Sequence, residues 1–265
     1  MKSAPAKIGL YVFALAAVAT GVVNLIWGAF ESAEEPIGAF GVTIPGERIV
    51  ADAVAAALVV GGLLLLTRGA VRAGAAVLAV IYAIFAIFWL PRLVTAPQVL
   101  GQHVGVYAGV LGGVCQQLIL VAAAALVYAG SLGDTLRSRQ ISKVARWVFG
   151  LSSIDFGLAH LYGIANTAQL VPAWMPFGGN FWTIVSGICF ILAGAGILSG
   201  LLDALAARLL GTMLLVFSAI VLPPLIFGYP HAQNAWGNNA YNLAAVGAAW
   251  ILAGYLAARK PRRTA

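Results

Sequence analysis

The segments GVVNLIWGAF (21–30) and GLAHLYGIA (157–165) are two versions of one sequence, and their pairing decides the fold. Three more pairs follow in the same order: AAALVVGGLLLLT (55–67) with ICFILAGAGILSG (188–200), FWLPRL (88–93) with IVLPPL (220–225), and QLILVAAAAL (117–126) with NLAAVGAAWI (242–251). The spacing between partners shrinks along the chain, from 136 residues at Asn24/His160 through 133 at Gly61/Gly194 and 132 at Pro91/Pro223 to 125 at Gln117/Asn242. Such drift is expected of a duplicated unit with diverged loops; the alternative is a chance match between stretches rich in Ala, Leu and Gly.

The composition predicts an integral membrane protein. Hydrophobic residues make up 62% of the chain and charged residues 9%, and the mean hydropathy is +0.97. A soluble domain carries about 25% charged residues, so this chain has too few to cover a surface that faces water. The two cysteines, Cys115 and Cys189, lie far apart inside apolar runs, which excludes a disulfide framework of the secreted type.

Eight apolar runs are long enough to cross a bilayer, which requires about 20 residues of helix. They are residues 8–30, 49–67, 70–90, 104–129, 147–165, 181–201, 204–222 and 239–258. The runs lack the alternation of membrane strands, and only helices or closed barrels satisfy the backbone in lipid. The sequence therefore predicts an all-α fold with eight transmembrane helices.

The basic residues predict the orientation, because Lys and Arg favour the cytoplasmic side. With the N-terminus inside, the inner segments hold 13 of the 15 basic residues, and Arg48 and Arg92 remain outside. Both termini are then cytoplasmic in a cell (inner) membrane, and residues 31–46 and 166–180 lie outside. The net charge of +7 thus reflects topology and attraction to the lipid bilayer, and no nucleic-acid partner is expected.

The pairs divide the chain into two four-helix units, residues 1–130 and 147–265, joined by a basic cytoplasmic linker, residues 131–146. Each unit has an even number of spans, so both enter the membrane from the same side. We therefore expect two parallel repeats related by a pseudo-two-fold axis along the membrane normal.

The second unit resembles the DoxX-like membrane proteins. The matching residues are His160 near the end of one span, the loop VPAWMPFGGNFW that leads into a glycine-rich span, Pro223 at the end of the third span and Asn242 early in the fourth. Asn24, Pro45, Pro91 and Gln117 are the fainter counterparts in the first unit. The chain differs at Arg92 and Pro224, where relatives commonly carry Asn, and it lacks an Arg near the fourth-helix amide.

The resemblance implies an accessory subunit of a membrane redox system, linked to quinones or thiols. A quinone is the candidate cofactor, and a soluble or membrane redox protein is the candidate partner. The sequence contains no self-sufficient catalytic motif, so any catalysis would belong to an oxidoreductase complex. A transporter and a membrane scaffold or assembly factor are the alternatives. The oligomeric state is left open.

Polar and aromatic residues cluster toward the outer ends of the predicted spans. Asn24 lies 16 residues and His160 13 residues past the start of its run, about 24 Å and about 20 Å along the helix axis. With Tyr241, Asn242 and Trp174 they form the candidate outer pocket for a quinone or another isoprenoid-like lipid, since such pockets are mostly apolar with a few orienting polar groups. Alternatively, His160 only joins two helices through a hydrogen bond.

Asp155 is the sharpest single residue, because it lies near the middle of a predicted span. A charged carboxylate at that depth is costly. Gln116 and Gln117, at a similar depth, are the expected hydrogen-bond donors to it. Asp155 is either a proton site, which would favour a proton-coupled transporter, or a neutral group that joins helices. The three histidines are far apart and show no metal-ligand spacing, so no metal is expected.

Overall fold

The structure, a computed structural model, describes residues 4–34, 46–133 and 135–259, and every regular element in these ranges is helical. The long helices are α1 (Ala4–Trp27), α2 (Glu47–Leu66), α3 (Val71–Trp89), α5 (Val104–Ser131), α6 (Leu136–Tyr162), α8 (Gly178–Ser199), α9 (Asp203–Val216) and α11 (Gln233–Arg259). The short ones are α4 (Arg92–Leu100), α7 (Ile164–Thr167), η2 (Ala168–Leu170), the π-helical η3 (Phe217–Val221) and α10 (Pro223–Gly228).

Seven helical stretches among the described residues are long and apolar enough to cross a membrane. An eighth is counted if α6 and the following α7–η2 turn, bent by 86°, form one broken span. Basic residues at the start of α6, together with Asp155 and His160, lower the hydropathy of this helix. The predicted helical membrane fold is confirmed at this level, since a helix lies in each of the eight predicted runs.

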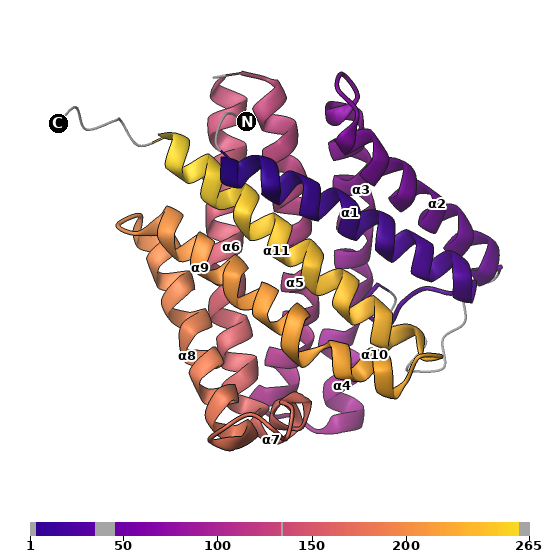
Figure 1. The fold of residues 1–265 in the computed structure, drawn as a ribbon, viewed down its shortest axis with the longest axis vertical. Coiled ribbons are helices and arrows are strands. Elements are labelled where there is room, and N and C mark those ends of the chain that lie inside the picture. The colour runs from indigo at the N-terminus through magenta and orange to yellow at the C-terminus, as the bar shows by residue number, and fades with distance from the viewer. Residues whose placement is uncertain (1–3, 35–45, 134, 260–265) are drawn as a thin grey trace.

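The long helices form a closed ring of neighbours in chain order. Each packs against the one before it and the one after it, and α11 packs along α1 to close the ring. Figure 1 shows the first and last of them, α1 and α11, side by side. Helices α5 and α11 also contact each other across the ring, and they are the most buried of the candidate spans. The interior therefore lies around α5 and α11, with one part on the side of α1–α3 and another on the side of α6–α9.

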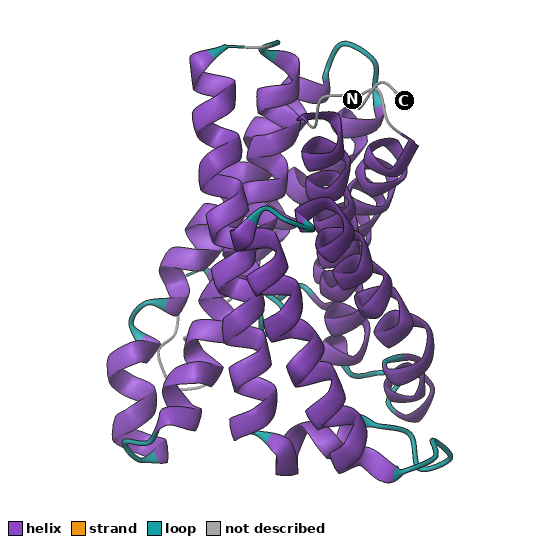
Figure 2. Cartoon of the chain, turned by 90° about the vertical axis from the view of Figure 1, so that its left-hand side faces the viewer, coloured by secondary structure: helices purple, strands orange, loops and turns teal. Residues whose placement is uncertain are grey.

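The two ends of the bundle differ in their connections and charge. Helices α4, α7 and α10 lie at one end, whereas the α5–α6 connection and the start of α1 lie toward the other (Figures 1 and 2). Gly254 of α11 packs directly against Ala6 of α1. The two helices therefore run antiparallel, with the start of α1 beside the end of α11. The basic residues at the start of α6 also lie at this second end, since Leu136 begins that helix.

Close helix crossings rely on glycine. A Cβ at Gly21 would lie 2.5 Å from the Ala55 carbonyl oxygen, and one at Gly62 would lie 2.6 Å from that of Ala14. Helices α1 and α2 can therefore approach only because these positions lack side chains. In membranes the hydrophobic effect does not drive helices together, so their association depends on close packing, which small residues allow.

Helices α6 and α8 cross in the same manner. A Cβ at Gly157 would lie 2.6 Å from the Gly187 carbonyl oxygen, and one at Gly194 would lie 2.5 Å from that of Gly150. Both crossings thus use a pair of glycines, one on each helix, against the backbone of the facing helix.

The third long helix of each half ends at a break. Helix α3 ends at Trp89, and Pro91 precedes α4. Helix α9 widens into the π turn Phe217–Val221, and Pro223 begins α10. Proline suits a first helical turn because its missing N–H would have no partner there. The basic segment expected as a linker is mostly helical, with the Thr135 hydroxyl capping α6 by accepting from the Ser138 N–H at 3.1 Å.

Candidate functional site

The segment after α1 folds into the bundle. The Ala33 carbonyl accepts hydrogen bonds from Gln117 Nε2 at 2.8 Å and from Trp89 Nε1 at 2.7 Å. Gln117 lies near the middle of α5, so this segment reaches well inside the protein. Residues 31–34 therefore pack into the bundle. That residues 31–46 lie on the outer side of the membrane stays a prediction, and 35–45 lie outside the described residues.

This segment places the carboxyl group of Glu34 in the interior, where it is fully buried. Its Oε2 accepts from Asn24 Nδ2 at 2.5 Å and from the Glu31 backbone N–H at 3.3 Å. Its Oε1 lies 3.2 Å from the Tyr241 hydroxyl, which donates to it. Asn24 is itself held by Gln233, whose Nε2 donates to Asn24 Oδ1 at 3.1 Å.

A second carboxyl group, that of Glu31, lies beside the first and is also buried. It accepts from the Ser32 hydroxyl at 2.8 Å and from the Ala33 N–H at 2.7 Å. Burial raises the pKa of Glu34 to about 8, opposed by the Asn24 hydrogen bond and reinforced by the charge of Glu31. Burial also raises the pKa of Glu31. Both carboxyl groups therefore favour the neutral form far more than exposed ones do.

We call this cluster the Glu34 site. It comprises Asn24, Glu31, Glu34, Tyr82, Gln117 and Tyr241, which come from α1 and the segment after it, α3, α5 and α11. Two of its buried polar atoms, the Tyr82 hydroxyl and Gln117 Oε1, have no hydrogen-bond partner among the described residues. The rings of Tyr82 and Tyr241 pack edge to face with centroids 6.5 Å apart. The site is closed, since Asn24, Glu34, Tyr82 and Gln117 are all fully buried.

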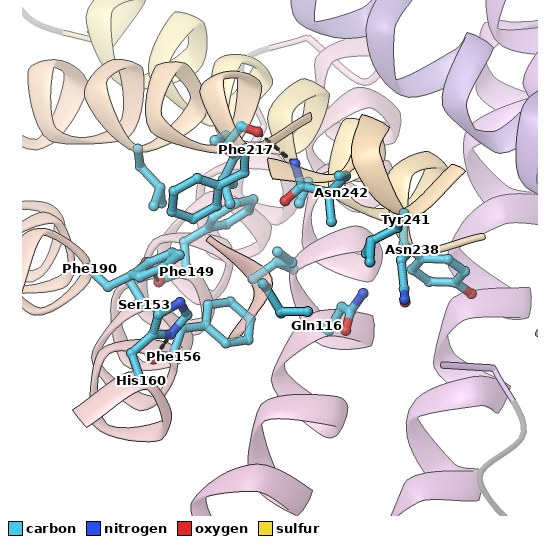
Figure 3. Close-up of a pocket in the computed structure, with 18 residues that line it drawn as sticks. Gln116, Phe149, Ser153, Phe156, His160, Phe190, Phe217, Asn238, Tyr241 and Asn242 are labelled. Atoms are coloured by element: carbon cyan, nitrogen blue, oxygen red, sulfur yellow. Dashed lines mark hydrogen bonds between the residues drawn. The ribbon is translucent and has the colours of Figure 1, made fainter. Parts of the chain in front are cut away.

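On the other side of α11 the interior is open. A cavity of about 330 Å³ lies between α5, α6, α8, α9 and α11 (Figure 3). Four phenylalanines line it: Phe149, Phe156, Phe190 and Phe217. His160 packs against one of them, with its ring centroid 5.1 Å from that of Phe190. We call this space the aromatic cavity.

A few polar groups face the aromatic cavity. His160 Nδ1 lies 2.8 Å from the Phe156 carbonyl oxygen, so in the neutral ring Nδ1 carries the proton and Nε2 is left as an acceptor. Asn242 uses its Nδ2 to donate to the Leu214 carbonyl at 2.6 Å and to Ser218 Oγ at 2.8 Å, which leaves its Oδ1 as an acceptor. Figure 3 shows His160 and Asn242 lining the same cavity as Gln116 and Asn238.

A second cavity, of about 520 Å³, adjoins the first. The two share His160, Leu170, Phe217, Leu222 and Asn242 as lining residues. The rest of its lining is largely apolar and comes from α8, α9, the π turn and the segment before α8. We call it the apolar channel. Cys189 and Val216, both exposed, line it, so it reaches the outer surface of the bundle between α8 and α9.

The structure divides the five residues of the predicted outer pocket. His160, Tyr241 and Asn242 line the aromatic cavity. Asn24 lies instead in the Glu34 site, where its amide is bound to a carboxyl group. Trp174 is 70% exposed and lines neither cavity. The separation has a simple cause, because the Tyr241 side chain stands between Glu34 and the cavity, with its hydroxyl directed away from the cavity (Figure 3).

The predicted group of Asp155, Gln116 and Gln117 is also divided. Gln116 lines the aromatic cavity, and Gln117 binds the Ala33 carbonyl. Successive residues on a helix point in different directions, so neighbours in sequence need not share a partner. Asp155 lies instead within hydrogen-bonding reach of Cys115, and its Oδ2 has no partner among the described residues.

The sequence reasoning missed Glu31 and Glu34 as site residues. Acidic residues after a span usually lie in an exposed loop, so the sequence did not indicate that they are buried. Three other residues do indicate a buried polar partner. Asn24, Tyr82 and Gln117 are polar groups inside three apolar runs of the first half, and buried polar groups need partners. Among the described residues, no group of three or more His, Cys, Asp or Glu side chains could share a metal ion.

No protein-family model, curated protein or solved structure matches this chain. The DoxX-like resemblance therefore stays a prediction. The two interiors, one closed around a carboxyl group and one open, are the features of the described residues that bear on function.

Proposed function

We propose that this chain binds a quinone, or a lipid with a similar polar head and isoprenoid tail, and presents it to a membrane redox partner. The observation that carries the proposal is the pair of adjoining cavities: an aromatic one with a few polar groups and an apolar one that reaches the bundle surface. A ligand dissolved in the bilayer could enter sideways between α8 and α9 without passing through water.

The polar groups of the aromatic cavity suit the head of such a ligand. The amides of Gln116 and Asn238 carry donors for a carbonyl, and the structure shows no hydrogen bond from either side chain to another described residue. The acceptors His160 Nε2 and Asn242 Oδ1 suit the hydroxyl groups of the reduced form. Ring faces of the phenylalanines offer stacking contact to a planar head. The cavity can therefore hold both redox states, as a carrier of reducing equivalents requires.

The apolar channel suits the tail. An isoprenoid chain has no polar groups, so a channel lined mostly by apolar side chains costs it no hydrogen bonds. The π turn at Phe217–Val221 lies where the two cavities meet. Such wide turns often occur at functional sites, since they displace side chains from the regular helical positions.

The resemblance to DoxX-like proteins supports the redox assignment and supplies the expectation of a partner protein. Asp155 lines neither cavity, so the geometry gives the transporter alternative no comparable support. We assign no catalytic residue to this chain alone.

We also propose that the two halves are parallel repeats. The order of helix neighbours is the same in both halves, and the glycine crossings correspond in detail. By its contacts Gly194 matches Gly62 rather than Gly61, because Ala14 and Gly150, the residues that face them, are 136 positions apart in sequence. The spacing within this pair of helices is thus 132 residues, one fewer than the sequence comparison indicates.

The proposed orientation places both termini in the cytoplasm, as the basic residues predict. It can be tested on α8, whose two flanking segments are exposed. In a variant that lacks both native cysteines, Trp174→Cys should react with an impermeant thiol reagent in intact cells, and Leu201→Cys should react only after lysis. These two positions are 70% and 79% exposed. The reverse pattern would invert the topology.

Lipid extraction from the purified full chain tests the proposed ligand. Quinones are extracted and quantified by mass spectrometry, per mole of protein, against a detergent blank. Leu214 lines the aromatic cavity, so Leu214→Trp should fill it and lower the retained quinone at least tenfold, or about 1.4 kcal/mol. Its neighbour Leu215 lies on the exposed face, and Leu215→Trp is the matched control that should retain the wild-type amount. Wild-type protein with no quinone or prenyl lipid above the blank would overturn the proposal.

A further inference from the structure

The Glu34 site holds two buried carboxyl groups, and no Lys, Arg or His side chain among the described residues contacts Glu34. The titratable groups that face it are Glu31 from its own segment, Tyr82 from α3 and Tyr241 from α11. Helices α1 and α5 contribute only the amides of Asn24 and Gln117. An ionised carboxylate in such a place costs several kcal/mol unless a positive charge neutralises it.

When Glu34 is ionised, one buried acceptor of the site has no hydrogen-bond donor. The Tyr241 hydroxyl has one hydrogen, and it donates this hydrogen to Glu34 Oε1. Gln117 Oε1 is then left buried without a donor, although the Gln117 amide lies within hydrogen-bonding reach of Tyr241. A buried acceptor without a partner costs about 1 to 3 kcal/mol.

A proton on Glu34 changes this arrangement. A protonated Oε1 donates to the Tyr241 oxygen, and the Tyr241 hydrogen becomes free for another acceptor. Gln117, whose amide lies within hydrogen-bonding reach of Tyr241, carries the unpartnered Oε1. The carboxyl oxygen Oε2 still accepts from Asn24 and from the Glu31 N–H. One added proton thus neutralises the buried charge and frees the Tyr241 hydrogen at the same time.

We propose that Glu34 is a proton-binding site, and that proton uptake from water reverses the hydrogen bond between Glu34 and Tyr241. Glu31 connects this site to the surface, because its carboxyl group interacts with Glu34 on one side and accepts from the exposed Ser32 hydroxyl on the other. The proposal concerns the closed interior and does not depend on a ligand in the aromatic cavity.

The test is infrared difference spectroscopy of the purified full chain between about pH 6 and about pH 10. The absorption of a buried protonated carboxyl group should disappear with a midpoint near pH 8, the pKa of Glu34. Glu34→Gln, which keeps the shape and most hydrogen bonds, should lose this transition. The control Glu47→Gln, at the partly exposed first residue of α2, should keep it.

Two neighbours give a readout that a merely structural carboxyl group would not. Tyr241→Phe removes a donor to the ionised form, so the midpoint should move to higher pH. Glu31→Gln removes a like charge, so the midpoint should move to lower pH. Tyr82→Phe removes a hydroxyl that donates to no described residue, and it should leave the midpoint in place.

Three results would overturn the proposal: no protonated band at low pH in the wild type, the same titration in Glu34→Gln, or a band that depends on sodium concentration at constant pH. The last would mean that a monovalent cation neutralises the carboxylate instead. If Glu34→Gln does not fold, the opposite shifts expected from Tyr241→Phe and Glu31→Gln still decide the question.

Discussion

The Glu34 site and the aromatic cavity are enclosed by helices in the same order but are lined by different side chains. Under the proposed repeat, Asn24 matches His160 and Tyr82 matches Leu214. Around the first pair the interior is closed and fully buried, whereas around the second it is a cavity of about 330 Å³. A bulky ring on α3 stands where α9 carries a smaller leucine. The difference therefore lies in a few interior side chains and not in the helix scaffold.

The segment after the first helix of each half makes the second difference. In the first half it turns inward and places Glu34 against α11. In the second half the matching residue is Leu170, which lines both the aromatic cavity and the apolar channel. The first half thus fills its interior with its own residues, whereas the second half leaves a cavity that a ligand can occupy. A scaffold with two such spaces can use one for stability and one for binding.

The largest contrast is expected from removing the polar residue at the end of the first helix in each half. Asn24→Leu leaves the buried Glu34 without its amide donor and Gln233 without its acceptor. It should lower the free energy of unfolding by about 3 kcal/mol. His160→Leu, at the edge of a cavity, should cost less than about 1 kcal/mol. Thermal unfolding in detergent measures both, and equal losses would contradict the comparison.

A smaller contrast is expected from exchanging the ring positions. Tyr82→Leu opens a cavity in the closed interior and should cost about 2 kcal/mol. Leu214→Phe fills part of the existing cavity, so it should be neutral or slightly stabilising in the same unfolding measurement. A marked loss of stability in Leu214→Phe would show that the second interior is already packed.

The smallest contrast is expected at the helix crossings. Gly62→Ala and Gly194→Ala each push a methyl group against a facing carbonyl, at 2.6 and 2.5 Å. Each should cost about 1 to 3 kcal/mol, and the two costs should agree within about 0.5 kcal/mol. A clear difference between them would argue against equivalent scaffolds and so against the repeat.

The sequence predicted the helices well, because hydrophobic length and composition decide them. The eight runs fall on α1, α2, α3, α5, α6, α8, α9 and α11, with ends shifted by a few residues. The largest shift is at α6, which begins at Leu136 within the expected linker. Its start is set by Thr135, whose hydroxyl accepts from the Ser138 N–H and caps the helix.

Part of the predicted outer pocket comes together in the second half, where His160, Tyr241 and Asn242 line one cavity. Gln116, predicted beside Asp155, lines the same cavity. Asn24 and Gln117 are predicted as polar groups inside spans, but the segment that both contact, residues 31–34, is not. The reason is physical: the charge rule for topology treats an acidic residue after a span as solvated, whereas burial raises the pKa of Glu34 and favours its neutral form.

The closing contact between α1 and α11 has a consequence for synthesis. Helix α1 is made first, and its principal neighbour, α11, is made last. Until the ribosome reaches Gln233 and Tyr241, the inward-turned segment lacks two of the side chains that hold Asn24 and Glu34. Early segments of a chain otherwise fold as they are synthesised. The first half therefore stays incompletely packed, with the face of α1 that contacts α11 exposed, until α11 is made. The segment inserted first is thus among the last to be buried.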